Sequence, residues 1–432
     1  SESSCAACLF SWSRRRRHAV FFFFLFAFRT HKRGCRRQLI GAVEGGAEEQ
    51  APQPARQPHG VSVMAEIYCF RPLVIEVVEP KGPTVPKPRS GHRIVASGAS
   101  VYAFGGYNPD NAGEDPSSAL FKELWRFNSY TKRWTNLLMT GNVPTELASH
   151  AALLHHDRML VYGGTGVPFG ERVSNRLYAF NLRTHHWDLV PTTGDVPYEQ
   201  YGQAMCVHMG HLYVLGGTTG FEYSMDVHQL CLSDLTWKRL PCISEPTRRY
   251  RHELAVYKNL IIVLGGGTAQ DSLPLRKLPA FNTSLLRWEV LFTAPDPPHG
   301  FPSKRRCHSS VQYRDAVFVC GGHNGTRVLD DVWRLDLPAL QWHRMPVRLP
   351  SPVYFHAAAV SESGQMFIFG GVTAVDGTSR CNSLWSMWLT VPSLLELSWL
   401  ALLHTAPWLA TLPAKQLARD GVPLSILERL QR

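Results

Sequence analysis

The chain has 432 residues, more than one ordinary domain of about 100 to 200 residues, so it forms either several domains or one large repetitive domain. With 44% hydrophobic and 18% charged residues, 34 Gly and 30 Pro, its composition indicates a turn-rich, mostly β globular protein and excludes wholesale disorder. The longest apolar run, residues 19–28, is far shorter than the roughly 18 residues that cross a bilayer. We therefore expect no membrane partner.

The net charge of +11 at pH 7 is unevenly distributed along the chain. Residues 1–63 hold ten Lys or Arg and four Glu, so this segment supplies +6 and the remaining 369 residues supply only +5. A nucleic-acid-binding protein concentrates its basic residues in a patch or stripe of the folded part. We therefore expect no nucleic-acid partner.

Residues 1–63 share no periodicity with the rest of the chain. Their arginine cluster, phenylalanine run and Pro/Gln-rich end predict a disordered basic leader. We hypothesise that it is an artefact of the gene model and that translation starts at Met64. A signal peptide is the alternative, but thirteen residues precede Arg14 and no small-residue cleavage site follows Phe28.

The ten cysteines are scattered without a disulfide framework. The close pair Cys5 and Cys8 has no second pair of Cys or His residues at the spacing of a zinc site. This pattern predicts free thiols in a reducing compartment. We expect a cytoplasmic and nuclear protein that holds no metal and no cofactor.

An internal repeat dominates the rest of the chain. Six Gly-Gly pairs each follow a short apolar segment, at steps of 58, 53, 49, 56 and 49 residues. These steps are close to the roughly 50 residues of a kelch unit and exceed the roughly 40 to 45 of a WD40 unit. The first glycines of the pairs are Gly105, Gly163, Gly216, Gly265, Gly321 and Gly370.

Two further landmarks recur in register with the glycines. In five units an aromatic residue or its replacement lies nine residues before a Trp, as in Trp125 and Trp134. A His, or Gln203 in the third unit, lies 13 or 14 residues before each first glycine. These landmarks resemble the kelch repeat, and their fixed order predicts an all-β fold, a six-bladed propeller over residues 64–390. We expect the Trp side chains to fill the space between blades and the His residues to form structural hydrogen bonds.

The sixth unit lacks a fourth strand at its C-terminal end, because position 394 is Leu394 where the repeat would have Trp. Residues 72–78, PLVIEVV, lie at the matching distance before the first unit. We therefore expect this segment to complete the sixth blade and to close the ring, which removes the exposed edges of an open sheet.

The turns that lead into the first strands meet around the axis of a kelch propeller, and loops on a rigid scaffold commonly carry function. In this chain they combine arginine with aromatic residues. Arginine binds carboxylates through two parallel hydrogen bonds, and aromatic rings can pack an apolar stem. We predict an anion-binding pocket there, although each single arginine could instead pair with a neighbouring blade. The candidate residues are Arg89, Tyr201, Arg249, Tyr250, Arg251, Arg305, Arg306 and Tyr354.

The chain carries no recognisable catalytic motif. It has no Walker loop, no GxSxG and no HExxH, and the glycine-rich residues 163–170 follow a repeat strand rather than opening a Rossmann helix. We therefore expect a non-catalytic protein.

After residue 390 the Gly-Gly rhythm stops and the spacing of apolar residues becomes helical. We expect residues 391–432 to form a helical tail, with Ser393 capping the first helix and further helices over residues 413–418 and 423–430. Four positions resemble the elongin-binding BC box: Ser393, Leu394, Ser398 and Leu402. Three more resemble the cullin-2 box: Leu412, Pro413 and Leu417.

The combination of these repeats with the tail is similar to the kelch-propeller substrate receptors of cullin-2 RING ubiquitin ligases. The resemblance rests on SGHR at 90–93, YGGTGVPFGE at 162–171, YRHE at 250–253, RRCHS at 305–309 and VPSLLEL at 391–397. It implies a receptor whose propeller captures C-terminal degrons with Gly or Ala ends. It also implies that Leu394 enters a pocket of elongin C, and that elongin B, elongin C and cullin-2 with its RING subunit are partners. The alternative is a kelch adaptor or scaffold for cytoskeletal or signalling proteins.

Overall fold

The computed structural model describes residues 73–431. The leader expected over residues 1–63 lies outside the described residues. The chain divides into two compact units, one of which is Pro72–Val391, while the other includes Pro392–Arg432. Each unit is described by itself.

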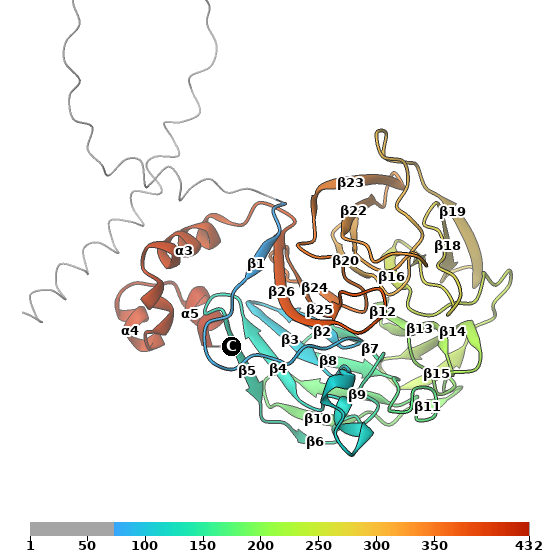
Figure 1. Ribbon diagram of the computed structural model, residues 1–432, viewed down its shortest axis with the longest axis horizontal. Helices are drawn as coiled ribbons and strands as arrows, with labels where there is room; N and C mark the ends of the chain where they lie inside the picture. Colours follow the sequence, from blue (N-terminus) through green and yellow to red (C-terminus); the bar gives the residue numbers. More distant parts are fainter. Residues whose placement is uncertain (1–72, 432) are drawn as a thin grey trace, which may run out of the picture. The chain divides into compact units, whose positions relative to one another are not determined.

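The strands of the first unit form six sheets, here numbered as blades 1 to 6 in chain order (Figure 1). Blade 1 consists of β2 (Arg93–Ser97), β3 (Ser100–Phe104), β4 (Leu124–Asn128) and β5 (Arg133–Leu137). Blade 2 consists of β7 (Ala151–His155), β8 (Arg158–Tyr162), β9 (Leu177–Asn181) and β10 (His186–Leu189). Blade 3 consists of β12 (Ala204–His208), β13 (His211–Thr218), β14 (Tyr223–Cys231) and β15 (Thr236–Arg239).

The second half of the ring continues the pattern. Blade 4 consists of β16 (Glu253–Tyr257), β17 (Leu260–Leu264), β18 (Lys277–Asn282) and β19 (Arg287–Phe292). Blade 5 consists of β20 (Ser309–Tyr313), β21 (Ala316–Cys320), β22 (Asp331–Asp336) and β23 (Gln341–Arg348). Blade 6 consists of β24 (Ala357–Val360), β25 (Gln365–Val372), β26 (Arg380–Trp388) and β1 (Glu76–Val78).

Short elements supplement this plan. The two-residue strands β6 (Thr140–Gly141) and β11 (Thr193–Gly194) pair in parallel with the outermost strands of blades 2 and 3. Two 3₁₀ turns, η1 (Pro109–Asn111) and η2 (Pro116–Ala119), lie in the connection between β3 and β4. These additions leave the repeating four-stranded plan unchanged.

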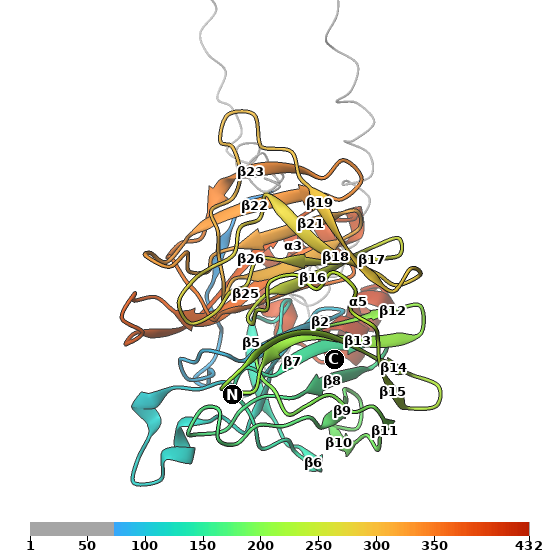
Figure 2. The same cartoon turned by 90° about the vertical axis from the view of Figure 1, so that its right-hand side faces the viewer.

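The first strand of each blade contacts the first strand of the next, and β24 contacts β2, so the ring is closed. This confirms the predicted six-bladed propeller. β1 supplies the outermost strand of blade 6 and pairs antiparallel with β26, placing Val78 opposite Leu384. The strand expected within residues 72–78 is therefore present, over its last three residues. Figure 2 shows the ring turned by 90°, with blades 4 and 5 at the top and blades 2 and 3 below.

A separate apolar cluster fills each space between neighbouring blades. Between blades 1 and 2, Trp187 is fully buried, and its ring lies 4.7 Å from that of Phe104. Between blades 6 and 1, Trp134 lies 5.1 Å from Phe369. Aromatic pairs at such distances bury large areas and add about 0.5 to 1.5 kcal/mol each. The recurrent Trp is thus the residue that joins one sheet to the next, as predicted.

The His and Gly-Gly landmarks are two halves of one contact. A Cβ added to Gly105 would lie 2.8 Å from the ring of His150 in the next blade, and one on Gly370 would lie 2.7 Å from the ring of His92. The His92 ring also hydrogen-bonds the Phe369 carbonyl at 3.0 Å. Glycine is therefore required by close packing as well as by its positive φ. Burial is the main cause that lowers the pKa of His150 to about 3.

The tail contains α3 (Leu394–Thr405), η3 (Pro407–Thr411), α4 (Ala414–Arg419) and α5 (Leu424–Gln431). Ser393 caps α3, with its hydroxyl accepting from the Glu396 amide. The three predicted helices are present, and η3 is an element that the apolar spacing did not predict. Among the described helices, none combines the length and apolar character needed to span a membrane.

Candidate functional site

Six backbone hydrogen bonds form a closed ring at the axis of the propeller. Each amide donates to the ring residue of the preceding blade, with N···O distances from 2.7 to 3.1 Å. All six residues have φ between 54° and 66°, the left-handed region, which turns the chain sharply into the first strand of each blade. This axial ring consists of Gly91, Ser149, Gly202, Arg251, Cys307 and Phe355.

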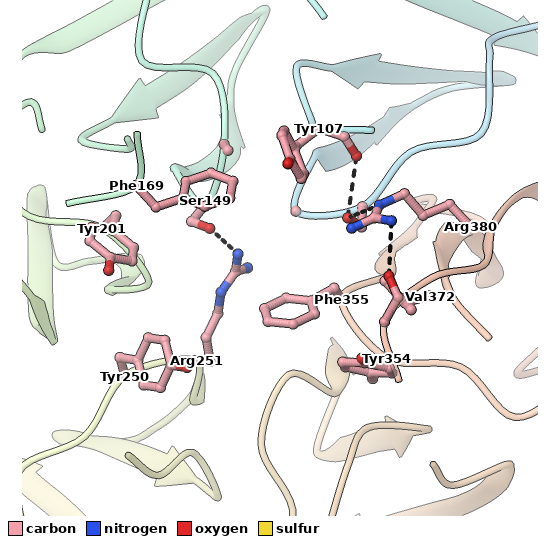
Figure 3. A pocket seen from close by; sticks show the side chains of 14 residues that line it. Tyr107, Ser149, Phe169, Tyr201, Tyr250, Arg251, Tyr354, Phe355, Val372 and Arg380 are labelled. Carbon is pink, nitrogen blue, oxygen red and sulfur yellow. Dashed lines mark hydrogen bonds between the residues drawn. The ribbon is translucent and has the colours of Figure 1, made fainter. Parts of the chain in front are cut away.

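A cavity of about 350 Å³ lies against the axial ring (Figure 3). Six of its fourteen lining residues are aromatic, and the wall includes two arginines, Arg251 and Arg380, but no carboxylate. This volume falls in the lower part of the ~300 to 1,000 Å³ range of ligand pockets. The lining residues are Ser90, Gly91, Tyr107, Ala148, Ser149, Phe169, Tyr201, Tyr250, Arg251, Tyr354, Phe355, Val372, Gly377 and Arg380.

Arg251 crosses the floor of the cavity from blade 4. One terminal nitrogen of its guanidinium donates to the Ser149 hydroxyl of blade 2, and its carbon lies 4.6 Å from the ring centre of Phe355 in blade 6. A Cβ on Gly91 would come within 3.2 Å of the same terminal nitrogen, so glycine there makes room for the arginine. Arg251 is only 7% exposed.

The guanidinium of Arg251 is incompletely hydrogen-bonded. Its Nε is buried and has no hydrogen-bond partner within the described chain. Burial lowers the pKa of Arg251, although arginine remains charged at neutral pH. A buried donor without an acceptor costs roughly 1 to 3 kcal/mol, and more for a charged group. Nε is too deeply buried to reach the cavity. NH1 also has no hydrogen bond within the described chain and is not fully buried, so an anion or carbonyl oxygen in the cavity could accept from NH1.

An ion pair closes the axis beside the axial ring. Arg93 and Glu253 follow the ring residues by two positions, on the innermost strands of the opposite blades 1 and 4, and their side chains meet at 2.8 Å. Arg93 also donates through Nε to the His150 carbonyl at 3.2 Å. Both side chains are mostly buried, 13% and 17% exposed. Arg251 and this pair both reach across the axis, so their side chains lie in the path that a channel along the axis would follow.

Three of the predicted arginines lie in the wall between blades and do not line the cavity. Arg89 and Arg305 are fully buried and pair with Glu123 at 2.7 Å and Asp331 at 2.9 Å. Arg89 donates through NH1 to the Gly105 carbonyl at 3.1 Å, and Arg305 donates to the equivalent Gly321 carbonyl at 3.0 Å. Both arginines therefore have structural partners, as the alternative for single arginines expected, but these partners belong to the blade that each turn leads into and not to a neighbouring blade.

Arg249 has the equivalent position in blade 4. It donates to the carbonyls of Thr247 and Gly265 at 2.9 and 3.0 Å. No carboxylate lies within ion-pair distance of it in the described chain, and burial lowers its pKa to about 10. Arg306 is half-buried, donates to the Ala269 carbonyl at 3.1 Å and is also absent from the cavity lining.

The predicted tyrosines do line the cavity. Tyr201, Tyr250 and Tyr354 are half-buried around it. Burial raises the pKa of each hydroxyl, which keeps all three protonated and able to donate at neutral pH. Tyr354 packs against His323 at 5.5 Å and against Phe355 at 5.1 Å.

Sequence analysis missed part of the cavity wall. Tyr107 and Phe169 lie in connections between the second and third strands, and Arg380 is the first residue of the third strand of blade 6, so none of them belongs to the turns before the first strands. Tyr107 and Phe169 belong to neighbouring blades and pack edge-on at 4.8 Å. Aromatic residues shortly after the first three Gly-Gly pairs were the available signal, and Tyr107 directly follows Gly106.

The tail residues with BC-box spacing differ in exposure. Leu394 is 58% exposed, Ser398 is half-buried and Leu402 is buried. An ion pair between Arg429 and Glu396 links α5 to α3. The cullin-box candidates lie at the start of α4, where Leu417 is fully buried, Leu412 is half-buried and Pro413 is exposed.

The closed ring of blades, the repeated landmarks and the axial cavity define a kelch β-propeller protein. The chain matches the KLHDC2/KLHL20/DRC7 Kelch-repeats domain over residues 57–266 and 244–393, and it belongs to this family. Within residues 73–431, no group of three or more His, Cys, Asp or Glu side chains is arranged to hold a metal ion.

Among individual proteins, the chain is a homologue of kelch domain-containing protein 10. It is 45% identical over 360 residues to that protein from Xenopus laevis, which covers 81% of this chain and 87% of the relative. The Homo sapiens protein is 44% identical over 359 residues, 81% of each chain. The Drosophila melanogaster homolog is 36% identical over 400 residues, 84% of this chain and 66% of the relative.

Proposed function

We propose that this protein is the non-catalytic substrate receptor of a cullin-2 RING ubiquitin ligase in the cytoplasm and nucleus. Its propeller cavity binds the C-terminal end of substrate proteins, and its tail binds elongin C. The proposal rests on the family resemblance together with the geometry of the cavity and the tail.

The observation that carries the proposal is the under-bonded Arg251 guanidinium at the closed end of an aromatic cavity. A cavity that ends at the axis excludes a polypeptide that threads through, so its occupant is a chain end or a small molecule. A terminal carboxylate would accept from Arg251 and from the Ser149 hydroxyl. Each hydrogen bond to a charged group contributes roughly 1.5 to 3 kcal/mol.

The wall of the cavity favours a small terminal residue. Arg251 and Phe355 occupy the floor, and half-buried tyrosines surround it, which leaves little space for a large last side chain. Gly or Ala ends, which the resemblance implies, suit this geometry. The surrounding rings provide apolar area for the residues before the end.

Exposure in the tail supports the proposed elongin contact. A leucine that enters a partner's pocket has to be accessible before binding, and Leu394 is 58% exposed at the first turn of α3. The buried Leu402 would then orient the helix instead of contacting the partner as its main anchor. Pro413 and Leu412 are the accessible members of the proposed cullin-2 contact.

Binding of chain ends is tested with the full chain in complex with elongins B and C. Fluorescence polarisation compares labelled ten-residue peptides that end in a free Gly carboxylate with the same peptides ending in an amide. We expect the amide to bind at least tenfold more weakly, which corresponds to about 1.4 kcal/mol. Equal binding of acid and amide would remove the carboxylate from the proposal.

The ligase assembly is tested by copurification with elongins B and C and cullin-2. Leu394→Ala should abolish the complex. Leu424→Ala is the matched control, because Leu424 is 74% exposed in the same tail but belongs to neither proposed box. Assembly that survives Leu394→Ala, or that fails equally in both variants, would leave the propeller as an adaptor without this docking mode.

A further inference from the structure

Arg380 is a second cation in the cavity wall, facing the same cavity as Arg251 (Figure 3). It is the first residue of β26 and comes from blade 6, whereas Arg251 comes from blade 4. Its Nε donates to the Ser90 hydroxyl of the turn before blade 1 at 3.1 Å, and NH1 donates to the Gly377 carbonyl at 3.0 Å. These two bonds fix the guanidinium between two blades.

The charge of Arg380 is not neutralised by an ion pair. No carboxylate of the described chain lies within ion-pair distance of it, although Asp110 on η1 is near enough to act on its titration. Its guanidinium carbon lies 5.3 Å from the ring centre of Tyr107. NH2 has no hydrogen bond within residues 73–431, so donors remain for an external acceptor. The other arginine of the wall, Arg251, has its own hydroxyl partner, Ser149.

The two cations are fixed by different blades and by different partners, Ser149 for Arg251 and Ser90 for Arg380. A bidentate contact uses one guanidinium fork and two oxygens. If Arg251 takes the end of the chain, Arg380 faces a residue upstream of it. Half-burial strengthens the field of Arg380 compared with that of a surface arginine, because the effective dielectric constant in the cavity is lower than in water.

We propose that Arg380, with Ser90 and Tyr107, forms a second subsite that reads the charge of a residue shortly before the chain end. This inference rests on the proposed function. The subsite favours acidic side chains and rejects Lys and Arg, because a ligand cation would face Arg380 with no carboxylate in the cavity wall to offset it. Discrimination by repulsion as well as attraction is a common source of specificity.

The test measures binding of ten-residue peptides that share a free Gly end. Glu, Gln or Lys stands at the second, third or fourth position from that end, and the other positions stay constant. With the wild-type chain in its complex with elongins B and C, the Kd of the Lys peptide should exceed that of the Glu peptide by about tenfold at one position or more. In Arg380→Gln this ratio should fall below about twofold at the same position.

The ratio is the readout because it cancels losses that all peptides share, including a general change in the shape of the cavity. Arg380→Lys keeps the charge without the fork and should retain most of the ratio. Arg183→Gln serves as a control, since Arg183 is 78% exposed and pairs with Asp157 on another part of the surface.

Two results would overturn the inference and leave the proposed function standing. One is wild-type binding of free-acid peptides with no charge preference at any of the three positions. The other is a preference that persists unchanged in Arg380→Gln. If free-acid peptides bind no better than amides to the wild-type complex, the subsite and the proposed function fail together.

Discussion

Arg249 and Arg251 belong to the same turn, two residues apart, yet they have opposite surroundings. Arg249 points into the wall between blades, where it donates to two backbone carbonyls, while Arg251 points across the axis and leaves Nε without a partner. The first position is repeated by Arg89 and Arg305, which form buried ion pairs. The comparison shows that the place of an arginine within the turn, rather than the presence of arginine, determines whether its side chain bonds to the backbone between blades or lines the cavity.

The largest expected effect is a loss of stability on substitution of Arg305, which occupies the same position in its turn as Arg249. Arg305→Met removes the ion-pair partner of Asp331 and the donor to the Gly321 carbonyl, leaving a mostly buried carboxylate whose remaining side-chain donor is the Trp333 indole at 2.7 Å. Breaking a buried ion pair in this way costs about 3 to 5 kcal/mol. Urea denaturation followed by tryptophan fluorescence measures the loss. The double variant Arg305→Met, Asp331→Leu should recover a large part of it, and a stability equal to that of the wild type for the single variant would contradict the wall role.

Substitution of Arg251, the arginine at the axis, should instead weaken peptide binding and leave stability nearly unchanged. Arg251→Gln should leave the free energy of unfolding nearly unchanged, since the guanidinium is under-bonded, but should weaken free-acid peptides by roughly 1.5 to 3 kcal/mol. Fluorescence polarisation and urea denaturation of the same preparation separate the two effects. If Arg251→Gln unfolds more easily but binds free-acid peptides normally, Arg251 has a structural role and the binding role proposed for it is wrong.

Low pH should lower the stability of the propeller through the landmark histidines that are buried between blades. Burial is the main cause that lowers the pKa of His150, His252 and His356 to about 3, below the value of about 6.5 in the unfolded chain. Between these values the unfolded state binds more protons, so the free energy of unfolding falls as pH falls below about 6.5. Each such histidine contributes up to roughly 1.4 kcal/mol per pH unit.

Blade 3 provides the control for this effect, because Gln203 occupies the landmark position there and donates to the Tyr162 carbonyl at 2.8 Å. His150→Gln should therefore fold and should show a shallower loss of stability between pH 6.5 and 5 than the wild type. Urea midpoints at several pH values measure the slope. An unchanged slope would mean that His150 does not titrate on unfolding as the geometry requires.

The smallest expected effect is a difference in peptide binding between the alanine variants of Gly91 and Gly98. Gly91 and Gly98 have φ of +66° and +55°, so alanine at either position costs about 1 to 2 kcal/mol in backbone strain. A Cβ at Gly98 meets nothing within 4 Å, whereas one at Gly91 approaches the Arg251 guanidinium to 3.2 Å. Gly91→Ala should therefore weaken peptide binding and Gly98→Ala should not, at similar cost in stability. Equal binding by both variants would show that the floor tolerates a displaced Arg251.

The repeat made most of the fold predictable. Gly-Gly pairs, Trp residues and histidines recur because each packs at the interface between neighbouring blades. Their spacing along the sequence therefore predicts the number and the order of the blades. The sixth unit lacks a fourth strand at its C-terminal end, which made the closure of the ring by β1 predictable. β1 itself lacks the Trp that the fourth strands of the other blades carry.

The site was less predictable, because neighbouring residues of one turn have different surroundings, some between the blades and some in the cavity. The sequence contains Arg249, Tyr250 and Arg251 in a row, and spacing alone does not reveal which of them faces the cavity. Arg380 was beyond reach for a different reason. It is the first residue of β26, directly after a connection whose length varies between blades, and the repeat has no landmark at that position.

The join between β1 and β26 has a consequence for synthesis. About 300 residues separate the two strands, and at roughly 5 to 20 residues per second the ribosome needs about 15 to 60 s to supply the partner of β1. During that interval the earlier blades can form one after another, while the unpaired edge of β1 waits. The last strand of the propeller to be translated, β26, is therefore the one that pairs with its first strand, β1. A chain that stops before β26 cannot form this pairing, so its ring stays open.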